Sequence, residues 1–272
     1  MKNHMKSFVA MLLVSLMVLA LVGCSSSDGD KTADYPKENI TVIVPYSAGG
    51  PADMSVRALL DAASKYLPSG VSFMPENQTG AGGLIGMSAT AASDNDGYTL
   101  GPIAVDLLMM KYEGKTQLGL DSFVPLAATM ADPYGLLVAA NNGKYDSVEE
   151  FVAYCKAHPG EVTVGNSGVG TATHLAAIAF ERDFGITPVS ETMNSDTNFR
   201  GWVVVCAPAG TDQAKIDYLS DIFAKAVASD EYKAAIRNLG MEPVELTGTA
   251  LNDMLKADDA KYAELCTGIT LN

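Results

Sequence analysis

Short apolar segments alternate with amphipathic ones along most of this 272-residue chain. The short segments favour strands, and apolar residues spaced three and four apart favour helices. We expect strands at residues 40–44, 71–74, 98–100, 135–139, 162–164 and 202–206. We expect helices at residues 52–67, 84–92, 147–158, 171–184, 216–227, 232–239 and 251–265. This alternation predicts an α/β fold with mainly parallel sheets.

The first residues have the features of an export signal. Lys2 and Lys6 precede an apolar run over residues 8–22, and Leu-Val-Gly-Cys ends it at Cys24. A charged start, an apolar run of this length and a small-residue cleavage site are typical of a secretory signal peptide, and the run is short for a membrane span. Residues 1–23 are therefore predicted to be a lipoprotein signal peptide, with lipid on Cys24 and a polar tether over 24–34. An ordinary signal peptide with an incidental Cys24 is the alternative.

The net charge limits the classes of partner. Formal net charge is −14, and removing Lys2 and Lys6 with the signal leaves 16 basic against 32 acidic residues, or −16. So acidic a protein is not expected to bind nucleic acid or an anionic membrane surface. Backbone dipoles can still bind a small anion locally, so an anionic ligand is not excluded.

Cysteine and histidine give no sign of a metal or cofactor. Cys155, Cys206 and Cys266 are far apart without a C-x-x-C spacing, which leaves either buried free thiols or one disulfide. After the signal only His158 and His174 remain, too few for a multi-histidine metal site. The chain also lacks a complete dinucleotide-binding or phosphate-binding loop, so no cofactor is expected.

Three glycine-rich loops, each between an expected strand and an expected helix, are the candidate binding elements. They cover residues 45–53, 76–83 and 165–174. Glycine lets the backbone approach a ligand, and the following helix offers unpaired N–H groups and a partial positive charge. Such loops bind anions without a charged side chain. The alternative is that the glycines only form tight turns.

The third loop also allows an enzymatic alternative. Ser167 and His174 could form a hydrolytic pair. Val169 occupies the position of the last glycine in a G-x-S-x-G nucleophile elbow, so that motif is incomplete. A lone histidine at a helix start more often has a structural role.

Several ordered motifs resemble one family of receptors. They are Tyr35-Pro36 with residues 40–53, Asn77-x-x-Gly80-Ala81-Gly82-Gly83-x-x-Gly86, residues 96–100, Gly168-x-Gly170-Thr171-x-x-His174, and residues 207–211 and 239–243. Together they are similar to the tripartite tricarboxylate transporter receptors, also called Bug-type solute-binding proteins. The resemblance covers nearly the whole mature chain.

The resemblance implies a two-lobed, type II periplasmic-binding fold and a binding role without catalysis. Lobe 1 would comprise residues 35–128 and 203–272, and lobe 2 residues 129–202. The ligand would be a tricarboxylate, a dicarboxylate or a related organic acid, delivered to integral-membrane transporter subunits. The protein would be an extracytoplasmic lipoprotein, anchored at the cell surface or in the periplasm.

The resemblance also implies the ligand-binding residues. The first jaw would be formed by Tyr46, Ser47, Ala48, Gly49, Gly50 and Asp53, above a floor of Gly82 and Gly83. The second jaw would be formed by Asn166, Ser167, Gly168, Thr171, Thr173 and His174. Asn166 stands where the family usually has a serine, which changes the polar contact expected there.

One departure from the family lies between Ile186 and Thr187. A block of roughly fifty residues, with strands and helices of lobe 2, is missing there by comparison with the family, which would remove much of that lobe's core. Lobe 2 is therefore expected to be truncated. A degenerate receptor that no longer binds a ligand is the further alternative.

Overall fold

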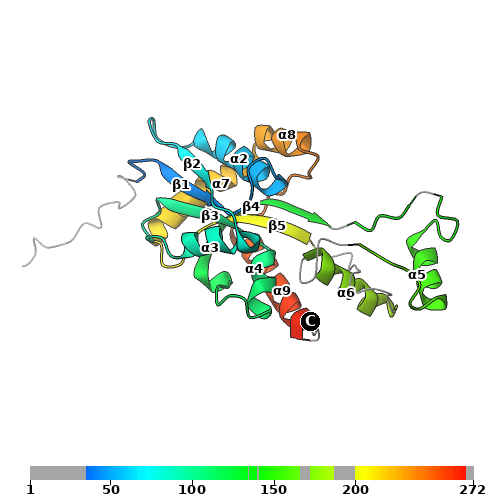
Figure 1. The fold of residues 1–272 in the computed structure, drawn as a ribbon. Coiled ribbons are helices and arrows are strands. Elements are labelled where there is room, and N and C mark those ends of the chain that lie inside the picture. The colour runs from blue at the N-terminus through cyan, green and yellow to red at the C-terminus, as the bar shows by residue number, and fades with distance from the viewer. Residues whose placement is uncertain (1–34, 134, 140, 166–171, 187–199, 268–272) are drawn as a thin grey trace, which may run out of the picture. The chain divides into compact units, whose positions relative to one another are not determined.

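A computed structural model describes residues 35–133, 135–139, 141–165, 172–186 and 200–267 (Figure 1). The chain divides into two units, residues 1–35 and 36–272. All described helices and strands belong to the second unit. The expected signal peptide, Cys24 and the tether lie outside the described residues.

In the described part of the chain, five strands form one mixed sheet in the order β2-β1-β3-β5-β4. They are β1 (Ile40–Val44), β2 (Phe73–Asn77), β3 (Thr99–Ala104), β4 (Phe123–Pro133) and β5 (Arg200–Pro208). β1 is parallel to β2 and β3, whereas β5 is antiparallel to β3 and β4. The expectation of mainly parallel pairing is therefore wrong, because the chain leaves the sheet at the end of β4 and returns beside it as β5.

Helices cover both faces of the sheet (Figure 1). One face carries α2 (Pro51–Ser64), α7 (Gln213–Ala228) and α8 (Asp230–Asn238), and the other carries α3 (Leu84–Ala91), α4 (Asp106–Tyr112) and α9 (Gly248–Thr267). The other described elements are η1 (Ala81–Gly83), η2 (Leu120–Ser122), α5 (Val148–Ala157) and α6 (Ala172–Phe184). The core between these layers is apolar, and the side chains of Val44, Leu59, Leu100 and Val204 are 0% exposed. This layered α/β arrangement confirms the expected fold class.

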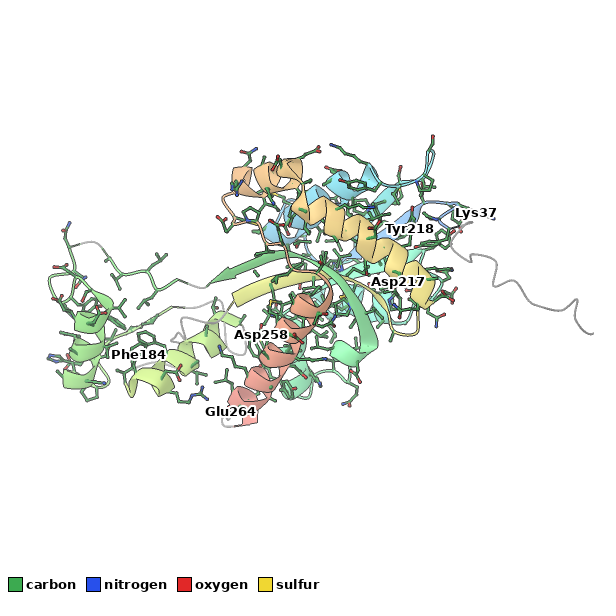
Figure 2. The ribbon with its side chains drawn as sticks, turned by 180° about the vertical axis from the view of Figure 1, so that it is seen from behind. Lys37, Phe184, Asp217, Tyr218, Asp258 and Glu264 are labelled. Carbon is green, nitrogen blue, oxygen red and sulfur yellow. The ribbon has the colours of Figure 1, made fainter. Side chains whose placement is uncertain are left out.

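Two consecutive acidic residues attach α9 to the rest of the fold. Trp202 Nε1 donates a 2.8 Å hydrogen bond to Asp258, which Figure 2 labels on α9. The Tyr112 hydroxyl donates a 2.7 Å bond to Asp259. Burial, together with the Asp259 carboxylate, raises the pKa of Tyr112 to about 12, so this phenol stays protonated and keeps donating at neutral pH.

Specific hydrogen bonds stabilise the start of α5 and the end of α8. Ser147 Oγ accepts a 3.1 Å hydrogen bond from the Glu150 amide and so caps α5. Gly240, with φ of 78°, closes α8: its amide donates to the Arg237 carbonyl and the Met241 amide donates to the Ile236 carbonyl. That pair of bonds is a Schellman motif, which satisfies the last carbonyls of a helix.

The expected second lobe has a small core and fewer strands than predicted. Residues 135–139 and 162–164, expected as strands, are coil. A strand needs a neighbour to satisfy its backbone, and no described strand pairs with either segment. Leu137 is 93% exposed. The remaining core is one cluster of Phe151, Val152, Cys155, Ala177 and Phe180, flanked by partly buried Leu136, Tyr145, Val162, Val164 and Ile186.

The three cysteines of the second unit are free thiols. Cys155 and Cys206 are buried and Cys266 is half-buried, so the disulfide alternative is wrong. Burial raises the pKa of Cys155 and, to about 11, that of Cys266, so these thiols stay protonated at neutral pH. Within the described ranges, no helix is both long enough and apolar enough to cross a membrane.

Candidate functional site

The first glycine loop forms a tight turn where β1 ends and α2 begins. The Gly50 amide donates a 3.2 Å hydrogen bond to the Ser47 carbonyl, and Gly49 has a φ of 78°. A positive φ at the third position fits a type II turn, in which glycine is favoured. Ser47, Ala48 and Gly49 are exposed at the tip of this turn, and Pro51 starts the helix.

The buried side chain of Asp53 stabilises the turn. Its side chain is 2% exposed, and its Oδ2 accepts a 2.9 Å hydrogen bond from the Gly49 amide. Arg57 Nε lies 2.9 Å from both carboxylate oxygens. Asn77 Nδ2, from the end of β2, donates a 2.8 Å bond to Oδ1. The carboxylate thus joins the turn, α2 and β2.

The Asp53 carboxylate is stable in its charged form. Burial alone would raise its pKa, but hydrogen bonds from Arg57, Asn77 and the Gly49 amide, with the Arg57 charge, hold it below its ordinary value of 3.8. Its stabilising effect is therefore present above that ordinary value and is lost only as the pH falls through the lowered pKa. The turn is held in place throughout the neutral range.

Asn77 extends this network to the backbone before the turn. Its Nδ2 also donates a 2.8 Å hydrogen bond to the Tyr46 carbonyl, and its Oδ1 accepts a 2.9 Å bond from Arg57 Nη2. Asp53 was predicted as a ligand-binding residue, whereas Asn77 was predicted only as part of the candidate loop over residues 76–83, and Arg57 was not predicted. The i, i+4 spacing of Asp53 and Arg57 on one helix face was the available signal.

The expected floor loop lies directly beside the first turn. Gly80, Ala81, Gly82 and Gly83 all have positive φ, from 47° to 134°. A Cβ built on Gly83 would lie 3.3 Å from the Tyr46 ring, so the two loops are in contact. A larger residue at Gly83 would press on the first loop.

Gly86 fixes the distance between the two loops. A Cβ there would lie 2.7 Å from the Gln78 carbonyl oxygen and 2.9 Å from Pro45 Cα. Both are backbone atoms, which cannot move aside as a flexible side chain can. The first turn and the floor loop are therefore held together by close backbone packing at the carboxyl ends of β1 and β2.

Several amides of this site have no described acceptor. Among the described residues, no hydrogen bond is made by the amides of Ser47 and Ala48 in the first turn, or of Ala81 and Gly82 in the floor loop. The amide of Gly49, in contrast, is used by Asp53. The available donors of the first turn are therefore the two at its exposed start, next to the N-terminus of α2.

The expected second jaw lies mostly outside the described residues. Asn166, Ser167, Gly168 and Thr171 fall there. Thr173, which is half-buried, and His174 lie in the first turn of α6, and the side chain of His174 is also outside the described set. Over the ranges that are described, no group of three or more His, Cys, Asp or Glu residues could hold a metal ion.

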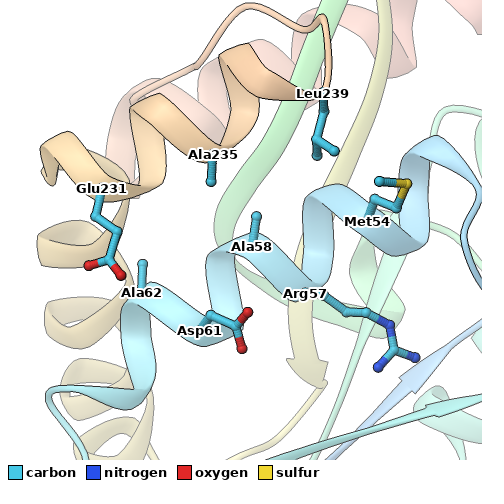
Figure 3. A pocket seen from close by; sticks show the side chains of 8 residues that line it. All are labelled: Met54, Arg57, Ala58, Asp61, Ala62, Glu231, Ala235 and Leu239. Carbon is cyan, nitrogen blue, oxygen red and sulfur yellow. The ribbon is translucent and has the colours of Figure 1, made fainter.

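A groove of about 360 Å³ lies between α2 and α8 (Figure 3). It is lined by Met54, Arg57, Ala58, Asp61, Ala62, Glu231, Ala235 and Leu239. None of the expected ligand-binding residues lines it, and in Figure 3 the Arg57 guanidinium points away from α8. This groove is therefore distinct from the two glycine loops.

About half of the chain matches the model of a known protein family. Residues 55–197 match the model of the tripartite tricarboxylate transporter family receptor. Protein BugT of Bordetella pertussis is 37% identical over 154 residues, which cover 54% of this chain and 45% of BugT. The chain spans about half the length of the curated relatives that it matches at 33% and 37% identity. A UPF0065 protein of a Pseudomonas species aligns at 21% identity over 309 positions, covering 91% of both chains.

Solved structures have the same fold. A TctC solute-binding protein from Polaromonas superposes with a TM-score of 0.76 at 24% identity, covering 86% of this chain and all of that one. MatC from Rhodopseudomonas palustris, solved with bound malate, has a TM-score of 0.64 at 18% identity, covering 85% of this chain and all of that one. The fold and the family match agree with the motifs in the sequence. The chain belongs to the tripartite tricarboxylate transporter receptor family.

Proposed function

We propose that this protein is an extracytoplasmic solute-binding receptor that captures a small carboxylate for a tripartite tricarboxylate-type membrane transporter. The observation that supports this most is the first turn, where the Asp53 carboxylate accepts a hydrogen bond from the Gly49 amide and the amides of the exposed residues Ser47 and Ala48 have no described acceptor. Family membership and the malate in MatC support the carboxylate.

Backbone amides bind the carboxylate group of the ligand. Amides of Ser47 and Ala48 donate to one carboxylate oxygen each, and the partial positive charge at the start of α2 adds to the attraction. Tyr46, Gly49, Gly50 and Asp53 shape this jaw, and Gly82 and Gly83 form the floor. This mode needs no basic side chain, which explains how so acidic a protein binds an anion.

The second jaw closes on the other side of the ligand with Asn166, Ser167, Gly168, Thr171, Thr173 and His174. Its support is reduced by the missing block near residue 186. The alignment with the Pseudomonas protein supports a missing block. It spans 309 positions but covers only 91% of the 272 residues of this chain, so about 60 positions are gaps in this chain. The loss of a block of that size would leave lobe 2 with a small core.

We therefore propose weak binding, with a Kd in the high micromolar range or above, or about −5 kcal/mol. An unsupported loop must be ordered on binding, which lowers affinity. Inserting a family-like segment between Ile186 and Thr187 should tighten binding and raise the melting temperature together. Residues 135–139 and 162–164 are coil where strands were expected, and the small core beside them favours one second candidate, a degenerate receptor that binds no carboxylate.

We propose that the receptor is attached to the membrane and that it has no catalytic activity. Lipid on Cys24 holds the receptor at the membrane, where it meets integral-membrane transporter subunits, and no catalytic role is assigned. The hydrolase alternative has its own test: an esterase activity lost in both Ser167→Ala and His174→Ala would contradict the receptor proposal.

Thermal unfolding with a panel of ligands tests the receptor proposal. A ligand that binds only the folded state raises the melting temperature. We expect dicarboxylates and tricarboxylates at millimolar concentration to raise it, and their uncharged amides to have no effect. If no carboxylate raises the melting temperature or gives heat in calorimetry, the degenerate-receptor candidate replaces the proposal.

A further inference from the structure

Asp106 lies at the same edge of the sheet as the two glycine loops. β1 and β3 are parallel neighbours, with Thr41 opposite Thr99 and Val42 opposite Leu100. Parallel strands end at the same edge, so the residues after β3 follow the same direction as the first turn after β1. Asp106 is the first residue of α4, two positions after β3 ends at Ala104.

The face of α4 that carries Asp106 is turned toward the floor loop. A Cβ built on Gly82 would lie 2.5 Å from Met110 Cε, so Met110 packs directly against the loop. Asp106 precedes Met110 by four residues and therefore lies on the same side of the helix. Both are half-buried, whereas Leu107, Leu108 and Met109 point into the core.

The Asp106 carboxylate has no described ionic partner. Burial raises its pKa, and a hydrogen bond from its own backbone amide offsets this in part. The nearest lysines along the chain are paired with other acids: Lys111 with Asp259 at 3.7 Å and Lys115 with Glu113 at 2.5 Å. A half-buried carboxylate without a partner gains from a cation placed beside it.

We propose that Asp106 selects carboxylates that also carry a protonated amine, so that the ligand is an amino acid or a similar zwitterion. The ligand carboxylate binds the Ser47 and Ala48 amides, and its ammonium group donates to Asp106. This inference rests on the proposed receptor function and narrows its substrate class. Backbone amides supply the positive end of the site, and Asp106 supplies the negative end.

Pairs of ligands that differ only in the amine test this inference. Calorimetry would compare aspartate with succinate and glutamate with glutarate on the intact protein. We expect the amino ligand of each pair to bind about tenfold more tightly, as one charge-assisted hydrogen bond would give. If succinate and glutarate bind as tightly as aspartate and glutamate, Asp106 does not select the amine and the inference is wrong.

Asp106→Asn provides the second measurement. It keeps the shape of the side chain and removes its charge, so we expect aspartate to bind about tenfold more weakly and succinate to change less than about threefold. Asp121→Asn, an exposed carboxylate in η2, is the matched control and should change neither affinity. An aspartate preference that persists in Asp106→Asn overturns the inference and leaves the receptor proposal standing. If none of the four ligands nor any other carboxylate binds, the receptor proposal fails and this inference fails with it.

Discussion

The carboxylate of Asp53 accepts a 2.9 Å hydrogen bond from the amide of Gly49, the residue with positive φ in the first turn. This bond removes the Gly49 amide from the set that a ligand could use. It also fixes the two preceding residues, Ser47 and Ala48, which are exposed. Asp53 therefore acts by holding the turn in shape, and Arg57 acts by stabilising the Asp53 charge.

Replacing Arg57 should loosen this turn. In Arg57→Ala the buried Asp53 carboxylate loses a charged donor, which should lower the free energy of unfolding by about 2 kcal/mol and weaken carboxylate binding. Lys225→Ala breaks an exposed i, i+4 pair with Asp221 and should cost less than about 0.5 kcal/mol. Urea unfolding and calorimetry of both variants measure these effects. Equal losses in the two variants would show that Arg57 is only a surface residue.

Replacing Gly86 should separate the two glycine loops. Gly86→Ala forces a methyl group against the Gln78 carbonyl and Pro45, and overpacking of this kind costs about 1–3 kcal/mol. Alanine is otherwise the better helix former, so a loss of stability in α3 identifies the steric effect. Gly135→Ala, with open space around it, is the control and should be near neutral. Unchanged thermal stability in Gly86→Ala would contradict the close packing.

Glu181 should make stability depend on pH. Burial raises its pKa from 4.5 to about 8, and its Oε1 has no hydrogen-bond partner in the described structure. The fold favours the neutral form of Glu181. Its ionisation therefore lowers the free energy of unfolding, an effect that is absent below pH 4.5 and grows as the pH rises to about 8. Glu181→Gln should match the wild type at low pH and melt at least ~3 °C higher above pH 8.

The control for this pH dependence is Glu38→Gln, which changes an exposed carboxylate. Its melting temperature should follow that of the wild type at every pH. Differential scanning over pH 4.5 to 8.5 compares the three proteins. A constant difference between Glu181→Gln and the wild type across this range would mean that Glu181 does not titrate in the fold.

The sequence predicted elements whose apolar period is strong and missed those that break it. β1, β5 and, apart from α4, the helices on both faces were found because their apolar residues recur regularly. β4 was missed because Pro125 and Pro133 argue against a strand, and its ladder is irregular between residues 125 and 130. The short helix α4 was missed because its N-cap, Val105, has no side-chain cap to mark it.

The sequence predicted the loops of the candidate site but not the side-chain contacts that hold them together. Glycine patterns identified the two loops, because positive φ and close backbone approach leave a mark in the sequence. The contacts of Asn77 with Tyr46 and Asp53 were not predictable, since they depend on the pairing of β1 with β2. Residues 135–139 were mispredicted because a β-rich sequence forms a strand only where a neighbour is present.

Cys24 gives a prediction about location. Cys24→Ala should prevent lipidation and leave a protein that is either released in soluble form or retained unprocessed. We expect release, because residues 8–22 are short for a membrane span. Fractionation of cells with immunodetection distinguishes these outcomes. A full-length variant that stays with the membrane would show that residues 8–22 are themselves an anchor.

The Ala48 amide is the donor on which the proposed anion-binding site depends most. Ala48 occupies the second position of the turn, where proline is compatible with the backbone. Ala48→Pro therefore removes one N–H group and should keep the fold, with a melting temperature close to that of the wild type. Ala48→Ser keeps the N–H group and serves as the control.

Isothermal titration of these three proteins with the carboxylate that stabilises the wild type most is the direct test. We predict that Ala48→Pro binds at least about tenfold more weakly than the wild type, as the loss of one hydrogen bond to a charged group requires. Ala48→Ser should bind like the wild type. If Ala48→Pro binds the carboxylate as tightly as the wild type does, the first turn is not the anion-binding site.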